Sequence, residues 1–180
     1  MDFLFLARPS LLDIIDSYGI ELIHPIRHGR SPQQFGAPGI SNHRWIVGAK
    51  WCVAVNHLGG IIGWAWAPAN AHDSWFHPLV ETLGQRTVLF ADTGFHAAAG
   101  DPDTLKVCRR GQRNERMLLE TVLSMFTVVC HTKKMRHRLP DYFKAHLALL
   151  VATFNLLIEW FGLPADENGF VPLSIAEFSQ

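Results

Sequence analysis

Cysteine is scarce in this sequence of 180 residues, and the few cysteines are widely spaced. Cys52, Cys108 and Cys130 form no CxxC pair and are odd in number, which argues against a disulfide framework and a structural zinc site. We therefore expect a reducing, cytoplasmic location. The longest apolar run, Leu147–Ile158, is interrupted by Asn155 and falls short of the roughly 20 residues that span a bilayer. A buried helix, and no membrane partner, is predicted for it.

A net charge is also lacking, because 16 basic and 16 acidic residues cancel. Their distribution is uneven. Residues 22–72 contain four basic residues and no acid, and Lys106–Arg138 contains nine basic residues and two acids. Two basic blocks in a neutral protein suit a localised face that binds a polyanion, with an ordinary solvated surface as the alternative.

Hydrophobic residues make up 48% of the chain and charged residues 18%, a balance typical of a folded protein. The length suits one domain with a hydrophobic core. Apolar runs bounded by turn residues predict strands at residues 11–23, 44–55, 61–67, 87–91 and 104–108, with a hairpin turn at 56–60.

Apolar residues at three- and four-residue steps predict helices at residues 74–83, 114–130 and 142–161. Asp73 or Ser74 is expected to cap the first of these helices, and Asp141 the last. Residues 24–42 are rich in Pro and Gly and are predicted to form a loop. This order of elements predicts an α/β fold, with a mixed β-sheet and helices packed on its faces.

Three acids occupy positions of interest in this predicted fold. Asp16 lies along the first strand, Asp92 follows the strand at 87–91, and Glu120 sits among apolar residues of the helix at 114–130. Each alone has an ordinary explanation as a strand-end, turn or solvent-facing residue. Together they suggest a site, because two-metal phosphoryl transfer needs carboxylates that converge on ions about 4 Å apart, and Mg²⁺ prefers oxygen ligands.

Other acids compete with these three. Asp13 lies three residues before Asp16, so on a regular strand it points to the opposite face of the sheet. Asp73 is interpreted as a helix cap or support. His72, Asp73 and His77 suggest a metal cluster, which is disfavoured because no further pair of ligands stands nearby.

Four segments in this order resemble the DDE domain of bacterial insertion-sequence transposases. They are Ile15–Leu22 (IDSYGIEL), Ser41–Gly48 (SNHRWIVG), Ala91–Phe95 (ADTGF) and Arg116–Glu120 (RMLLE). The resemblance extends over about residues 11–163. It implies a ribonuclease-H-like fold in which Asp16, Asp92 and Glu120 are the catalytic and metal-binding carboxylates. The implied cofactor is Mg²⁺, with Mn²⁺ as a substitute.

The resemblance also implies a function, namely metal-dependent DNA cleavage and strand transfer of an insertion sequence. The implied partners are transposon-end and target DNA, with a homodimer and a nucleoid-associated location as further expectations. Supporting or DNA-binding roles fall on five basic residues, which are Arg110, Arg113, Arg116, Lys133 and Lys134. Related transposases often carry Tyr and Lys where this sequence has Arg113 and Thr127.

The resemblance predicts a catalytic domain over residues 1–163 and a C-terminal tail over 164–180. About ten residues precede the first predicted strand, so we expect the N-terminal DNA-end-binding region usual in such transposases to be missing. Two alternatives stay open. One is a nuclease of the same fold, and the other is an inactive remnant that only binds DNA or a partner.

Overall fold

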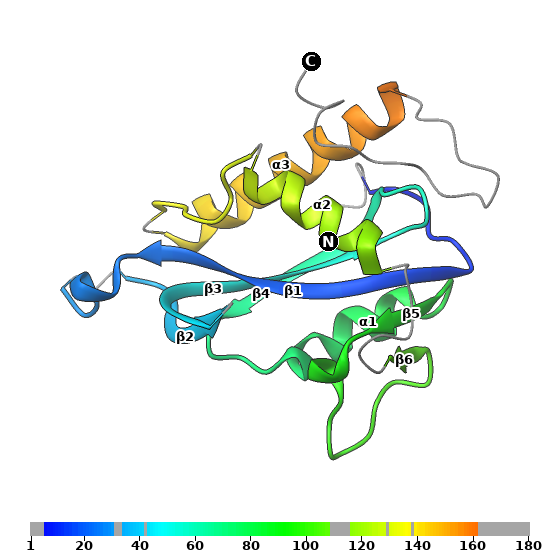
Figure 1. Cartoon of the computed structure of the whole chain (residues 1–180), viewed down its shortest axis with the longest axis horizontal. Helices are drawn as coiled ribbons and strands as arrows, with labels where there is room; N and C mark the ends of the chain where they lie inside the picture. Colours follow the sequence, from blue (N-terminus) through cyan, green and yellow to red (C-terminus); the bar gives the residue numbers. More distant parts are fainter. Residues whose placement is uncertain are drawn as a thin grey trace.

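The computed structural model describes residues 6–30, 34–41, 43–108, 116–128, 130–137 and 139–161, except for the side chains of 116–119 and 161. Over these residues the chain forms a mixed β-sheet with helices on both faces, as Figure 1 shows. The predicted α/β class and the packing of helices on the sheet faces are therefore confirmed.

The long strands β1 (Leu12–Ile23) and β3 (Arg44–Val55) form the centre of the antiparallel half of the sheet. The other edge of β3 is shared by two strands. Residues 44–48 pair with β2 (Ala37–Ser41), and residues 49–55 pair with β4 (Ile61–Pro68). The predicted strands at 11–23, 44–55 and 61–67 are confirmed to within one residue at each end.

The side chain of Asn56 stabilises the hairpin turn between β3 and β4. Its side-chain Oδ1 accepts hydrogen bonds from the backbone N–H groups of Leu58 and Gly60, at 3.0 and 2.9 Å. Gly59 adopts a φ of 85°, in the left-handed region that glycine enters without steric cost. The sequence NHLGG thus forms the turn that its composition predicts.

The parallel half of the sheet consists of β1, β5 (Val88–Ala91) and β6 (Leu105–Val107). Between β4 and β5 the chain passes through the 3-10 helix η3 (Asp73–Phe76) and helix α1 (His77–Leu83). These two elements cover one face of the sheet. The opposite face carries α2 (Arg116–Val128) and α3 (Pro140–Phe161), above β1 in Figure 1.

The sheet therefore separates two hydrophobic cores. The core beneath α2 and α3 contains Trp51, Phe126 and Phe143, and the core beside α1 contains Phe76 and Phe95. Alternation along β1 divides its residues between them, since Ile14 and Ile20 join the first core and Ile15 joins the second.

Helix α3 buries one face only. Phe143, Leu147, Val151 and Phe154 pack in the core, whereas Leu149, Leu156 and Trp160 are more than half exposed. The prediction of a buried helix is thus right for one face. The helix over residues 140–160 is long and apolar enough to cross a membrane, with a mean hydropathy of 1.3. A single helix of this kind is weak evidence of a membrane span, because the core helices of soluble proteins share these properties.

Asn155 explains why a polar residue interrupts this apolar helix. Its amide oxygen accepts from the backbone N–H of Ile61, and its amide nitrogen donates to the Ile61 carbonyl, both at 2.8 Å. The side chain therefore satisfies the backbone of Ile61 and fixes α3 to the start of β4. Each such hydrogen bond contributes about 1 kcal/mol to the stability of the fold.

Several sequence-based predictions are wrong in detail. Strand β2 lies within the predicted loop at 24–42, where its Pro and Gly obscure the strand pattern. The side chain of His72, rather than Asp73 or Ser74, caps η3, and Asp141 lies in the first turn of α3, which begins at Pro140. Trp45, within the predicted strand at 44–55, is 65% exposed.

Asp13 is fully buried on the α1 side of β1, where both of its carboxylate oxygens accept from the Ser10 N–H at 3.1 Å. Burial raises the pKa of this carboxyl above its usual value, and hydrogen bonds from Thr87 and Ser10 oppose that shift. A raised pKa means that the folded chain binds this proton more tightly than the unfolded chain. The associated stability is complete below the unfolded pKa and declines as pH rises through the folded pKa.

We expect the free energy of unfolding to decline from about pH 4 upward, near the unfolded pKa of Asp, and Asp13→Asn to remove that part of the decline. Urea unfolding of both proteins at a series of pH values measures this. Asp103→Asn, at an exposed position, is the control and should follow the wild-type profile. Parallel profiles for wild type and Asp13→Asn would contradict the assignment.

Candidate functional site

The parallel pairing of β1 with β5 brings two of the three predicted carboxylates side by side. Leu12 is opposite Val88, and Ile14 is opposite Phe90. Two residues further along each chain stand Asp16 and Asp92. The backbone of Asp92 is still extended, with φ −81° and ψ 177°, so the register carries through to this pair.

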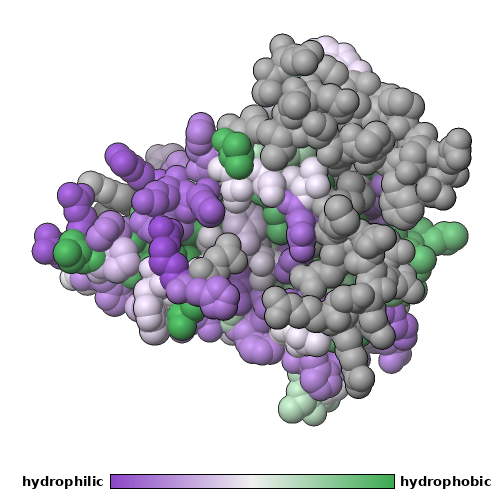
Figure 2. Space-filling view, in the orientation of Figure 1, coloured by the Kyte–Doolittle hydropathy of each residue, from purple (hydrophilic) through white to green (hydrophobic). Residues whose placement is uncertain are grey.

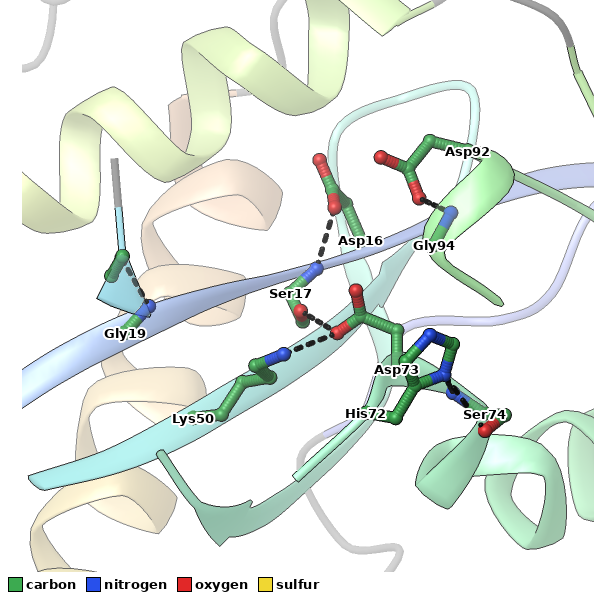
Figure 3. Close-up of polar contacts among 10 residues, drawn as sticks. Asp16, Ser17, Gly19, Lys50, His72, Asp73, Ser74, Asp92 and Gly94 are labelled. Atoms are coloured by element: carbon green, nitrogen blue, oxygen red, sulfur yellow. Dashed lines mark hydrogen bonds and ion pairs between the residues drawn. The ribbon is translucent and has the colours of Figure 1, made fainter. Parts of the chain in front are cut away.

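Both carboxylates point to the same side of β1. Asp16 shares its strand face with Ile14 and Ile20, which belong to the core beneath α2 and α3. Figure 3 shows the side chains of Asp16 and Asp92 together on that side, with Asp73 on the other side of the strand. The expectation that Asp13 and Asp16 occupy opposite faces is confirmed, because Asp13 is buried on the α1 side.

Each of the two carboxylates accepts a hydrogen bond from nearby backbone. An Asp16 oxygen accepts from the Ser17 N–H at 2.7 Å, and an Asp92 oxygen accepts from the Gly94 N–H at 2.9 Å. The second contact caps the 3-10 helix η4 (Thr93–Phe95) that begins directly after Asp92. These contacts fix both side chains at the end of the parallel strand pair.

Glu120 does not join the pair. It lies on α2, which contacts β1, but its side chain is exposed. Helix α2 directs Val122, Met125 and Phe126 into the core, and Glu120 is about 200° around the helix from Val122. Among the residues that the structure describes, no three His, Cys, Asp or Glu side chains lie close enough to hold one metal ion.

The predicted supporting residues are distributed differently. Arg110 and Arg113 lie outside the described residues, and Arg116 begins α2 with its side chain also outside them. Lys133 and Lys134 are exposed beside Glu21 on β1. Glu21 is five residues after Asp16 along the strand, a distance of roughly 17 Å, so these lysines do not adjoin the acid pair.

Asp73 is the centre of a hydrogen-bond network that the sequence pattern does not predict. One Asp73 oxygen accepts from the Ser17 hydroxyl at 2.5 Å and from the Lys50 ammonium at 3.0 Å. Lys50 and Ser17 share this face because Lys50 is opposite Gly19, two residues from Ser17, on paired strands. The sequence did contain a signal, since Lys50 is the one charged residue after Arg44 in the strand 44–55.

The same network reaches the turn that holds Asp92. A Cβ atom on Gly94 would lie 2.6 Å from the second Asp73 oxygen and 3.0 Å from an Asp92 oxygen. The carboxylates of Asp73 and Asp92 therefore both lie next to Gly94, and no room is left there for a side chain. The ammonium of Lys50 offsets part of the negative charge that Asp16, Asp73 and Asp92 concentrate here.

Cys52 lies beneath this network and is fully buried. Burial raises the pKa of its thiol well above the usual value, and the charges of Asp16 and Asp73 raise it further. The group is therefore a neutral thiol at physiological pH. It has neither the exposure nor the thiolate character of a nucleophile.

The side chains of His72, Asp73 and His77 have separate partners. His72 Nδ1 pairs with the Ser74 hydroxyl at 3.0 Å, and His77 Nε2 lies 2.7 Å from the carbonyl oxygen of Phe95. Asp73 points instead towards Lys50 and Ser17, as Figure 3 shows.

Comparisons of this chain with known protein families, with curated proteins and with solved structures find no match.

The Asp73 network should contribute to stability. Asp73→Ala removes the acceptor of both Lys50 and Ser17 at a position where the Lys50 and Asp73 side chains are 17% and 20% exposed. An unpaired, largely buried polar group costs about 1–3 kcal/mol, so we expect the free energy of unfolding to fall by that amount in urea titrations.

Two further variants separate this explanation from a general loss of packing. The double variant Asp73→Ala with Lys50→Met removes both charges and should recover part of the lost stability. Asp103→Ala, at an exposed position, should leave the unfolding midpoint unchanged. Wild-type stability of Asp73→Ala would refute the role of the network.

Proposed function

We propose that this chain is the catalytic domain of a DDE-type transposase with a ribonuclease-H-like fold, acting on DNA by metal-dependent phosphoryl transfer. One observation carries the proposal: Asp16 and Asp92 stand side by side where the parallel pairing of β1 with β5 ends, and they point to the same side of the sheet. Paired carboxylates at such a place are the minimal protein ligands of a catalytic Mg²⁺.

The sheet order supports the proposed fold. Strands β4, β3 and β1 are consecutive antiparallel neighbours, and β1, β5 and β6 are parallel, with α1 between β4 and β5. A ribonuclease-H-like sheet has this arrangement of three antiparallel strands followed by two parallel ones. In this order Asp16 lies on the first strand, β1, and Asp92 directly follows the fourth, β5.

Asp16 and Asp92 fit a hard divalent cation. Both are partly exposed carboxylates, and Mg²⁺ is commonly held by one or two such groups together with water and substrate phosphate. When bound, Mg²⁺ or Mn²⁺ supplies positive charge at the phosphoryl group and lowers the pKa of a coordinated water. The chain's own contribution is to orient the two carboxylates through the Ser17 and Gly94 amides.

The position of Glu120 favours a second candidate function. Because its side chain is exposed and outside the acid pair, the arrangement also suits a domain that binds DNA without cleaving it. In the proposed transposase Glu120 is the third carboxylate, the role that the sequence resemblance assigns to it. A transposase cleaves DNA and needs Glu120 to do so, whereas a domain that only binds DNA does not cleave it.

The central test is Asp92→Asn. This change retains the size of the side chain and removes the charge that a divalent cation requires, so we expect loss of Mn²⁺-dependent cleavage by at least about a hundredfold. Cleavage of a labelled duplex measures this, and calorimetric titration with Mn²⁺ measures binding. Asp103→Asn is the control and should keep full activity. Undiminished cleavage by Asp92→Asn would end the proposal.

Glu120→Gln distinguishes the candidates further. A transposase or nuclease loses cleavage in this variant, whereas a domain that only binds DNA shows no cleavage in the wild type and unchanged DNA binding in the variant. Joining of a pre-cleaved 3′ end to target DNA then separates the two enzymes. A transposase joins the ends, and a nuclease of the same fold does not.

A further inference from the structure

Two basic segments that are far apart in the sequence meet at one end of the molecule. The loop after β1 contains Arg27 and Arg30, and the segment between α2 and α3 contains Lys133, Lys134 and Arg136. Backbone hydrogen bonds join the second segment to β1, from the Glu21 N–H to the Lys133 carbonyl at 3.0 Å and from the Met135 N–H to the Glu21 carbonyl at 2.9 Å.

Glu21 contacts basic residues at this end of the molecule. Its carboxylate accepts from Arg44 at 2.9 Å and lies 3.7 Å from the ammonium of Lys134, while its own side chain is only 9% exposed. The two cations keep 56% and 63% of their side-chain surface in solvent. One buried acid therefore holds a cation of β3 and a cation of the segment between α2 and α3 in place, while leaving both accessible to a ligand.

The resulting surface is strongly positive. We define the basic end as six exposed cations, which are Arg27, Arg30, Arg44, Lys133, Lys134 and Arg136. Glu21 is the one acid bonded to them among the described residues, and residues 22–72 and 121–140 contain no Asp or Glu. Figure 1 places η2 (Pro25–Arg27) and the segment before α3 at the same end, and Figure 2 shows that end as largely hydrophilic.

We propose that the basic end binds the phosphate backbone of duplex DNA, at a place separate from the position cleaved at Asp16 and Asp92. The inference rests on the proposed function, which places the reacting phosphate at these acids. The two sites are separate because Glu21 lies roughly 17 Å along β1 from Asp16. Arginine and lysine on several segments suit backbone contact, which positions DNA without reading its sequence.

Salt dependence of DNA binding tests the proposal. Each phosphate contact contributes about −0.9 to the slope of log K against log salt concentration. The double variant Arg27→Gln with Lys133→Gln should make that slope shallower by roughly 1.8. Fluorescence anisotropy of a labelled duplex in EDTA measures binding without any metal-dependent step. Neither substitution removes an ion-pair partner of the Glu21 carboxylate, because those partners are Arg44 and Lys134.

The matched control is Arg86→Gln with Lys106→Gln, which removes two exposed cations that lie outside the basic end. It should retain the wild-type slope. Circular dichroism melting confirms that both double variants fold. Equal slopes for wild type and Arg27→Gln with Lys133→Gln, or a shallower slope in the control alone, would overturn the proposal.

A second arm distinguishes DNA from an anionic membrane. Vesicles of phosphatidylglycerol and phosphatidylcholine are offered in place of the duplex, and we expect no binding that depends on the basic end. Binding to vesicles but not to DNA overturns the proposal. The binding assay contains EDTA, so its result does not depend on a metal ion. Absence of Mn²⁺-dependent cleavage in the separate cleavage assay, together with a changed slope in the binding assay, refutes the catalytic function and leaves DNA binding by the basic end supported.

Discussion

The pairing of β1 on both of its edges is the constraint on which the rest of the structure depends. One edge is antiparallel to β3 and the other is parallel to β5, so the strand cannot slip relative to either neighbour without disrupting both ladders. Side-chain alternation then assigns each residue of β1 to a core. Ile14 and Ile20 face α2 and α3, Asp13 and Ile15 face α1, and Asp16 is held where the strand meets Asp92.

The two carboxylates occupy this point without the usual cost of burying charge. Asp16 and Asp92 are partly exposed and accept local backbone N–H groups, whereas Asp13, three residues away, is fully buried and has a raised pKa. The same strand thus holds one acid as a packed structural group and another as an accessible carboxylate. The difference lies in which face each residue occupies, not in the residue type.

Much of this arrangement could be predicted from the sequence, because it depends on local patterns. The strands containing Asp16 and preceding Asp92, the hairpin turn at Asn56 and the helices follow from hydrophobic periodicity and turn residues. Strand β2 could not be predicted, because its Pro38 and Gly39 are typical of loops and are tolerated here on the edge of β3. The orientation of Glu120 and the partners of Asp73 depend on tertiary packing, which periodicity does not specify.

The charge of Glu21 and its neighbours has a consequence for how the molecule behaves in an electric field. The basic end carries six cations and one carboxylate, hence a formal charge of +5, so the rest of this neutral chain carries −5. A body with no net charge is not pulled towards a distant polyanion, but its dipole experiences a torque. Near a polyanion the protein therefore rotates to bring its basic end towards the negative charge before it binds. Its isoelectric point near 7.2 gives no sign of this property.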